Sequence, residues 1–324
     1  MTPAGELLAA EIERDGPIPF RRFMEVALYH PRHGYYRRAR DPFGREGDFF
    51  TAEQMQPVFA ILMAARVRQI WRAMGEPEDF TVVEPGAGRG EMAGAFAEWR
   101  YIPVEIGSGS LPQHFRGVVF SNEFFDALPV DAVIGARGEY RQRRVAWREG
   151  RFQWQTAEPV AGAAADYLAR YGAPAEEGRL MEVNLAALEW IERIGKHLVS
   201  GAMLTIDYGY RRNELIRFPA GTLMSYRRHT AVEDVLAEPG ERDITAHVNF
   251  TAMEEHGAAH GWRTERFENL AQTILAAGEA DQFAAALEAA DESERTRRRM
   301  KLKTLLVGMG ETFRVLLQAR KQGE

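Results

Sequence analysis

The feature that most constrains this chain is residues 81–92, which read TVVEPGAGRGEM. The β-branched run at the start predicts a short buried strand, and one acidic residue and three glycines at alternate positions follow it. Glycine allows a sharp turn and a close ligand approach, and the amides that open a following helix point into the same space. The segment therefore predicts a strand, a tight turn and a helix start beside a bound ligand.

The spacing of these glycines discriminates between ligands. The dinucleotide pattern G-x-G-x-x-G needs a glycine where Glu91 stands, and the Glu91 carboxylate would disfavour a pyrophosphate. No Lys-Ser or Lys-Thr follows, so the Walker phosphate-binding pattern fails as well. The segment instead resembles the E-x-G-x-G-x-G motif of class I S-adenosylmethionine-dependent methyltransferases. Its cofactor-binding residues are then Glu84, Gly86, Gly88 and Gly90, although a structural turn would also explain the motif read alone.

Length, charge and cysteine content exclude several classes of partner and site. A chain of 324 residues can bury a large core, and a formal charge of −6 provides no general electrostatic reason to bind nucleic acid. The absence of cysteine excludes disulfides, thiolate nucleophiles and cysteine-bound zinc, and it agrees with a reducing compartment. No apolar run approaches the length of a membrane span, and residues 2–12 predict a capped amphipathic helix rather than a targeting peptide. We therefore expect a cytoplasmic protein with no nucleic-acid partner and no membrane partner.

Further segments resemble the MidA-like family of methyltransferases, also called DUF185. Residues 47–52 are similar to its G-D-F-x-T block, and residues 121–130 are similar to its N-E-x-x-D-A-L-P-V block. Four later blocks follow in the family order, at residues 206–209, 221–229, 243–250 and 308–313. The family includes a mitochondrial complex I assembly factor that methylates a protein arginine. The resemblance thus implies S-adenosylmethionine as cofactor and an arginine-containing protein as substrate.

The resemblance also implies the architecture. We expect an α/β class I methyltransferase fold, a Rossmann-like doubly wound sheet with an N-terminal helical segment and a β-hairpin insertion. Residues 1–75 are predicted to be a helical and loop segment that covers the active site. Residues 76–324 are predicted to be the Rossmann-like domain, with the insertion at about 132–178, where Arg137-Gly138 and Glu149-Gly150 are hairpin-turn signals.

Methylation of an arginine side chain requires carboxylates beside the guanidinium. A guanidinium is a poor nucleophile because its pKa exceeds about 12, so facing carboxylates must orient it and take up its charge. The block after the fourth strand supplies Glu123 and Asp126, and the resemblance assigns these and His229 to catalysis. It places Asn122 and Glu105 beside the cofactor. The expected substrate-pocket residues are Tyr36, Asp48, Phe49, Thr51, Asp207, Tyr208 and His247.

Other features leave alternatives open. Glu105 and Gly117 lie too close for the helix and third strand usual at this point, so Glu105 is either a ribose ligand or an ordinary turn carboxylate. Two other functions compete with arginine methylation: an inactive methyltransferase-like assembly or chaperone module, and a methyltransferase for a small molecule or nucleic acid. An NPPY-type catalytic block is absent, which argues against base methylation.

The C-terminal third carries charged and alanine-rich patterns. His256 and His260 lie four apart on a predicted helix, but no third ligand is spaced to help them, so no metal site is expected. Residues 271–292 predict one alanine-rich helix. The basic run at 295–303 is expected to be a solvated helix face.

Overall fold

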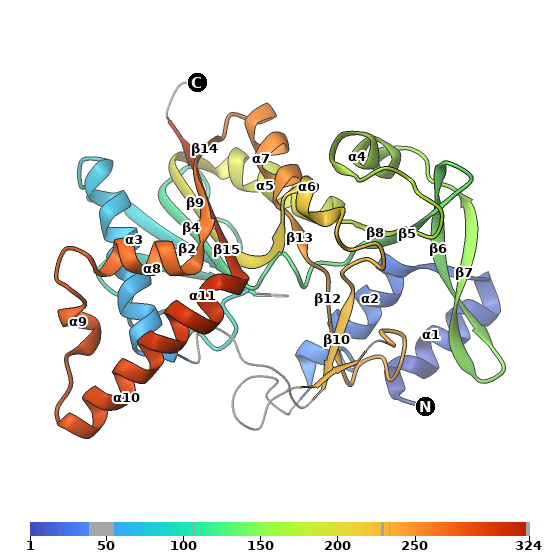
Figure 1. Ribbon diagram of the computed structural model, residues 1–324, viewed down its shortest axis with the longest axis horizontal. Helices are drawn as coiled ribbons and strands as arrows, with labels where there is room; N and C mark the ends of the chain where they lie inside the picture. Colours follow the sequence, from blue (N-terminus) through green and yellow to red (C-terminus); the bar gives the residue numbers. More distant parts are fainter. Residues whose placement is uncertain (39–54, 106–107, 228–229, 233, 322–324) are drawn as a thin grey trace. The chain divides into compact units, whose positions relative to one another are not determined.

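The structure is a computed structural model that describes residues 1–38, 55–105, 108–227, 230–232 and 234–321 (Figure 1). The chain divides into two compact units, and each unit takes three separate segments of the sequence. Unit 1 comprises Met1–Phe50, Phe125–Glu189 and Tyr210–Ala252, and unit 2 comprises Thr51–Phe124, Trp190–Gly209 and Met253–Glu324. This division differs from the predicted boundary near residue 75, because helix α3 (Val58–Ala73) packs within unit 2.

Unit 2 contains the expected Rossmann-like sheet, with strand order β14-β15-β9-β4-β2-β3. Strand β2 pairs in parallel with β3 and β4, β4 pairs in parallel with β9, and β15 is antiparallel to its neighbours β9 and β14. The strands are β2 (Phe80–Pro85), β3 (Arg100–Val104), β4 (Phe115–Asn122), β9 (Leu198–Tyr210), β14 (Arg263–Asn269) and β15 (Phe313–Arg320). The chain runs from β2 to β3 on one side and then to β4 on the other. The carboxyl ends of β2 and β4 therefore form the switch point at which open α/β sheets bind ligands.

The sequence of the central strands explains why they pair so closely. Every residue of β2 is buried, which is typical of a parallel strand covered on both faces. Gly117 in β4 has φ of +147°, and a Cβ there would lie 1.9 Å from the carbonyl oxygen of Thr81 in β2. Any larger residue at Gly117 would therefore separate β4 from β2 at the middle of the sheet.

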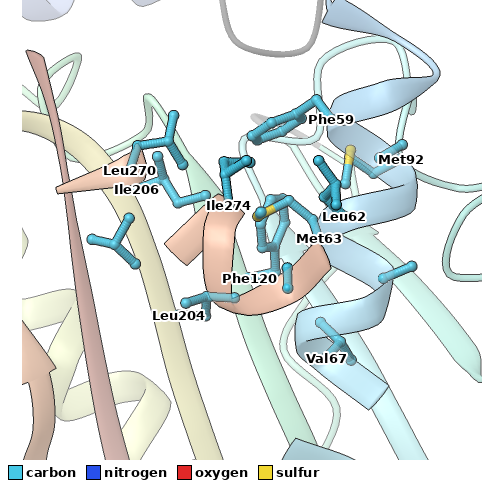
Figure 2. Packing of buried hydrophobic residues seen from close by; sticks show 14 of the residues in the cluster. Phe59, Leu62, Met63, Val67, Met92, Phe120, Leu204, Ile206, Leu270 and Ile274 are labelled. Atoms are coloured by element: carbon cyan, nitrogen blue, oxygen red, sulfur yellow. The ribbon is translucent and has the colours of Figure 1, made fainter. Parts of the chain in front are cut away.

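Helices α3 and α8 (Leu270–Gly278) cover one face of this sheet (Figure 2). The buried positions of α3 recur at helical spacing, so that one stripe faces the strands. Each fully buried aliphatic or phenyl side chain contributes about 1.5–3 kcal/mol to stability. The labelled members of this core are Phe59, Leu62, Met63, Val67, Met92, Phe120, Leu204, Ile206, Leu270 and Ile274.

The single helix predicted for residues 271–292 is wrong. Helix α8 ends at Gly278, a short α9 (Ala284–Leu287) follows, and α10 (Glu292–Lys303) begins after Asp291, which caps it. The break arises because Asp281 accepts the amide of Phe283 at 3.0 Å and the amide of Ala285 at 2.9 Å, which starts a new helix. Phe283 itself is left-handed, with φ of +64°. Beyond α10 come a π-helical turn (Thr304–Gly308) and α11 (Met309–Thr312).

Unit 1 is built on an antiparallel sheet of order β1-β6-β5-β8, with β7 paired to β6. The strands are β1 (Ile18–Pro19), β5 (Asp131–Ala136), β6 (Glu139–Arg148), β7 (Arg151–Pro159) and β8 (Leu180–Val183). Both predicted hairpins are confirmed: Arg137-Gly138 joins β5 to β6, and Glu149-Gly150 joins β6 to β7. All four turn residues have positive φ, which the two-residue turns of twisted hairpins require.

The remaining elements of unit 1 complete its core. Helices α1 (Pro3–Asp15) and α2 (Phe20–Tyr29) contribute buried Leu8, Ile12 and Phe23 to the same cluster as Val145 of β6. Residues 1–29 are therefore part of the packing of unit 1, and their predicted role as a cover for the active site stays a prediction. The other elements are η1 (Tyr35–Arg37), α4 (Ala163–Tyr171), α6 (Arg212–Leu215), β10 (Met224–Arg227), β11 (Thr230–Val232), β12 (Asp243–Thr245) and β13 (Val248–Asn249).

Two helices pass from unit 1 into unit 2 along the chain. They are α5 (Leu185–His197), which leads directly into β9, and α7 (Phe250–Ala259). Among the described helices, none is both long enough and apolar enough to cross a membrane.

Candidate functional site

The glycine loop after β2 has the backbone that its sequence predicts. Gly86, Gly88 and Gly90 have φ of 71°, 55° and 75°, a region that other residues rarely adopt. A Cβ on Gly86 would lie 2.8 Å from the ring of Phe124, whereas a Cβ on Gly90 would meet nothing within 4 Å. The loop is thus packed on one side at Gly86 and open at Gly90.

The helix predicted to start in this loop is not formed. Residues 88–98 run as consecutive turns, and several bonds join an amide to the carbonyl three residues earlier, as from Gly90 to Ala87 at 2.8 Å and from Ala93 to Gly90 at 3.0 Å. Left-handed glycines interrupt the helical backbone, and Gly94 adds a residue that costs about 1 kcal/mol in a helix. Ligand contacts at the loop therefore rely on single amides and side chains rather than on the end of a regular helix.

Glu84 occupies the end of β2 and is almost completely buried, with 1% of its surface exposed. The Tyr101 hydroxyl donates to its Oε2 at 2.5 Å. Burial raises the pKa of Glu84 to about 8; the hydrogen bond from Tyr101 opposes this rise, and the charges of Glu91 and Glu105 add to it. Glu84 is therefore largely protonated at neutral pH, and a cation placed beside it would favour the ionised form.

Glu105 follows the end of β3, next to Glu84 in the sheet. Its Oε1 accepts the backbone amide of Gly88 at 2.6 Å, so this carboxylate holds the glycine loop. Its backbone closes a turn with Ser108 through two hydrogen bonds of 2.9 and 3.0 Å. Within residues 108–114 the structure assigns no helix and no strand apart from this bridge, which confirms that the usual helix and third strand are missing there.

The end of β4 carries Asn122 and Glu123. The Asn122 amide donates to Glu123 Oε1 at 3.2 Å, while the buried side-chain oxygen of Asn122 meets no hydrogen-bond donor among the described residues. Glu123 is left-handed, with φ of 52°, and its backbone amide donates to the carbonyl of Ile206 at 2.9 Å. Strained non-glycine backbone concentrates at functional sites, and residues 123–127 form no helix.

The end of β9 adds Asp207 and Tyr208. The Asp207 side chain is fully buried, and its Oδ1 accepts the amide of Tyr208 at 2.9 Å. The Tyr208 ring packs on Phe313, with centroids 4.0 Å apart. Because β2, β3, β4 and β9 are parallel neighbours, their carboxyl ends place Glu84, Glu105, Asn122 and Asp207 along one edge of the sheet.

Comparisons with known proteins identify the family of this chain. Residues 96–268, more than half of the chain, match the family described as "putative S-adenosyl-L-methionine-dependent methyltransferase". The chain belongs to this methyltransferase family. A crystal structure of a protein from Burkholderia thailandensis bound to S-adenosyl-homocysteine is 31% identical to it, with a TM-score of 0.88, and the match covers 99% of this chain and 92% of that protein.

Curated relatives share a more specific name. The Drosophila melanogaster homolog of the mitochondrial protein arginine methyltransferase NDUFAF7 is 27% identical over 319 residues, which covers 78% of this chain and 70% of the relative. The Homo sapiens protein arginine methyltransferase NDUFAF7 is also 27% identical, over 78% of this chain and 68% of the relative.

The methyltransferase uses S-adenosylmethionine, and the strand-end residues fit this cofactor. The unpartnered oxygen of Asn122 can accept a hydrogen bond from one of the cofactor's hydroxyl or amino groups. The buried carboxyl of Glu84 suits a positively charged ligand better than a phosphate, because a cation would stabilise its ionised form. The open space at Gly90 allows close approach to the loop.

Two contributors to this edge carry no sequence motif. Tyr101 approaches Glu84 only because β2 pairs with β3, which brings two residues 17 positions apart together. Phe124 lies between the glycine loop and Trp190, whose ring it meets edge-on with centroids 5.1 Å apart. The family block contains position 124 but does not specify an aromatic there, so only the packing reveals its role.

Among the residues that the structure describes, three predicted residues of the methyltransferase belong to unit 1, namely Tyr36, Asp126 and His247. Tyr36 donates to Asp243 Oδ1 at 2.9 Å, and its pKa is raised first by burial and then by the nearby charges, which include Asp243 and Asp126. Both aspartates are buried. His247 packs against Tyr210, and burial lowers its pKa to about 4, so its ring is neutral at pH 7. Predicted residues Asp48, Phe49, Thr51 and His229 lie outside the described residues.

Proposed function

We propose that this methyltransferase acts on arginine side chains of a protein. The acceptor class comes from the curated relatives, which carry this activity in their names and match more than three quarters of the chain. The geometric observation that supports it is Glu123, a carboxylate held in a left-handed conformation at the switch point of the sheet, directly after Asn122, the predicted cofactor contact.

The chemistry requires such a carboxylate. When bound, S-adenosylmethionine supplies a methyl group activated by a positively charged sulfur. Transfer would replace the bond from sulfur to the methyl carbon by a bond from a guanidinium nitrogen, leave S-adenosylhomocysteine, and pass one guanidinium proton to water. We assign to Glu123 the orientation of the guanidinium, because a carboxylate accepts its N–H donors in a paired, charge-assisted geometry.

Unit 1 supplies a second group of carboxylates. Asp126 and Asp243 are 4% and 2% exposed, and both influence the pKa of Tyr36. Buried carboxylates are retained where they are paired or bind a cation. Asp126 stays a predicted catalytic residue and His247 a predicted substrate-pocket residue. The cytoplasmic location stays a prediction, since the curated relatives are named mitochondrial.

The proposed acceptor is tested by single-turnover assays with labelled S-adenosylmethionine. Arginine-containing peptides, matched peptides with lysine in place of arginine, and a panel of small amines are offered as acceptors, and mass spectrometry locates the methyl group. We expect methylation on arginine nitrogen alone. Transfer only to lysine or to a small amine would reject the arginine proposal. S-adenosylmethionine binding without transfer to any acceptor would favour the assembly-module alternative.

A further inference from the structure

We propose that Glu192, His256 and His260 form a binding site for one divalent transition-metal ion of the zinc, cobalt and nickel class. Glu192 lies on α5, His256 on α7, and His260 directly after α7, and all three belong to unit 2. They come from helices rather than from the strand ends that hold the cofactor. The sequence shows only the histidine pair, because the third ligand is 64 residues away along the chain from His256.

The three side chains direct ligand atoms at one point. Glu192 Oε1 lies 3.1 Å from His256 Nε2 and 3.7 Å from His260 Nε2. The ligand atoms of the three residues all lie within 4.8 Å of one another. Two imidazole nitrogens and one carboxylate oxygen suit zinc and its neighbours in the periodic table, and a fourth position stays available to water.

The hydrogen bonding of His260 sets its tautomer. His260 Nδ1 lies 2.8 Å from the carbonyl oxygen of His256, and a carbonyl can only accept, so Nδ1 carries the proton. In the neutral ring the lone pair is then on Nε2, which faces Glu192 at a distance too long for a hydrogen bond. A lone pair and a carboxylate that face the same space are stabilised by a cation between them. A histidine that binds a metal through one ring nitrogen usually donates the N–H of the other to a carboxylate, a carbonyl or water, as Nδ1 of His260 does here.

The backbone of His260 is fixed before any ion binds. The end of α7 is closed by bonds from Trp262 to the Gly257 carbonyl at 3.0 Å and from Gly261 to the Ala258 carbonyl at 3.3 Å, with Gly261 at φ of +80°. These two hydrogen bonds form a Schellman motif, in which His260 is the C-cap residue and Gly261 follows it in the left-handed conformation. Arg320 donates to the His260 carbonyl at 3.2 Å. Metal binding would therefore cost little free energy for ordering the backbone of His260.

The competing explanation is that protonated histidines form ion pairs with Glu192 and hold no metal. The two explanations differ in metal stoichiometry. The test uses the untagged full chain, treated with a chelator and dialysed, and then titrated with Co²⁺ or Zn²⁺ alone. Binding is followed by the visible absorption of Co²⁺ and by calorimetry of Zn²⁺. Because the chain has no cysteine, no thiolate contributes to either signal.

We expect saturable binding of one ion per chain. His256→Gln and His260→Gln should each weaken it by at least about tenfold, and Glu192→Gln by a smaller factor. His114→Asn is the matched control, because His114 is exposed and its φ of 48° is one that asparagine tolerates. Melting temperatures in chelator should be equal for all variants, which separates metal loss from misfolding. Absence of saturable binding, or equal binding by the His256→Gln/His260→Gln double variant, would overturn the proposal.

Discussion

Two glutamates with raised pKa values, one in each unit, differ in what surrounds them. In unit 1, Glu182 of β8 accepts the Thr222 amide at 3.0 Å on one oxygen and the Thr222 hydroxyl at 2.8 Å on the other. In unit 2, Glu84 at the end of β2 accepts a hydrogen bond from the Tyr101 hydroxyl, and the side-chain oxygen of Asn122, at the end of the neighbouring strand β4, meets no donor among the described residues. Burial raises the pKa of both glutamates. A raised pKa alone therefore does not distinguish the two glutamates, whereas Glu84 differs by its position at a strand end of the parallel sheet, where we predict contact with the cofactor.

The largest expected effect is the pH dependence that Glu84 imposes on unit 2. Its pKa is raised from 4.5 to about 8, so between these values the folded chain keeps a proton that the unfolded chain has lost. The free energy of unfolding therefore decreases as pH rises through this window, by at most about 5 kcal/mol. Glu84→Gln cannot ionise, and its stability relative to wild type should rise with pH across the window.

Urea unfolding of the cofactor-free protein at several pH values measures this difference. Glu98→Gln, an exposed glutamate that pairs with Arg68, is the control and should show little change. A stability difference between Glu84→Gln and wild type that stays constant with pH would show that Glu84 is already ionised in the folded protein.

The next effect concerns Glu123. Glu123→Gln keeps the shape of the side chain but removes the charge that pairs with a guanidinium, so single-turnover methyl transfer should fall by about 30- to 1000-fold, or about 2 to 4 kcal/mol. Affinity for S-adenosylmethionine should be retained. Glu149→Gln is the matched control, because Glu149 has nearly the same left-handed φ, 53°, in an exposed hairpin turn of unit 1. Near-normal transfer by Glu123→Gln would remove it from the catalytic residues.

A comparable effect is expected for the glycine loop. S-adenosylmethionine at about 100 times its dissociation constant should stabilise the wild-type protein by about 2.7 kcal/mol, which raises the melting temperature by a few degrees. Gly88→Val should abolish this shift, since a branched side chain strains the positive φ and displaces the amide bound to Glu105. Gly94→Ala, where a Cβ meets nothing within 4 Å, should keep the shift. A normal shift for Gly88→Val would mean that the cofactor does not approach this loop.

The smallest effect tests the unit 1 side of the comparison. Thr222 is buried, and Thr222→Val removes the hydroxyl that donates to Glu182. This loss should lower the free energy of unfolding by about 1 to 3 kcal/mol. Thr222→Ser, which keeps the hydroxyl, should recover most of it. Cofactor affinity should be unchanged in both, measured by calorimetry. A selective loss of cofactor affinity at full stability would mean that Glu182 belongs to a functional site as well.

Local patterns predicted most of the elements that build the site. The strand before the glycine loop, the strand before Asn122 and both hairpins are where their sequence patterns and turn residues place them. The two elements predicted wrongly, a helix in the glycine loop and a continuous helix over 271–292, fail for a common reason. Left-handed residues and short-range hydrogen bonds at Gly90, Asp281 and Phe283 outweigh a helical composition.

The sequence by itself determined the Rossmann-like fold, the cofactor and the family, because these depend on ordered local motifs. Only the tertiary structure decided which groups face one another. Strand pairing brings Tyr101 to Glu84, and helix packing brings Glu192 to His256, across 17 and 64 residues of chain. The tertiary structure also sets the pKa of Glu84, because this pKa depends on how far the surrounding side chains exclude water from the carboxyl group. Such properties arise from contacts between distant segments, and no local spacing encodes them.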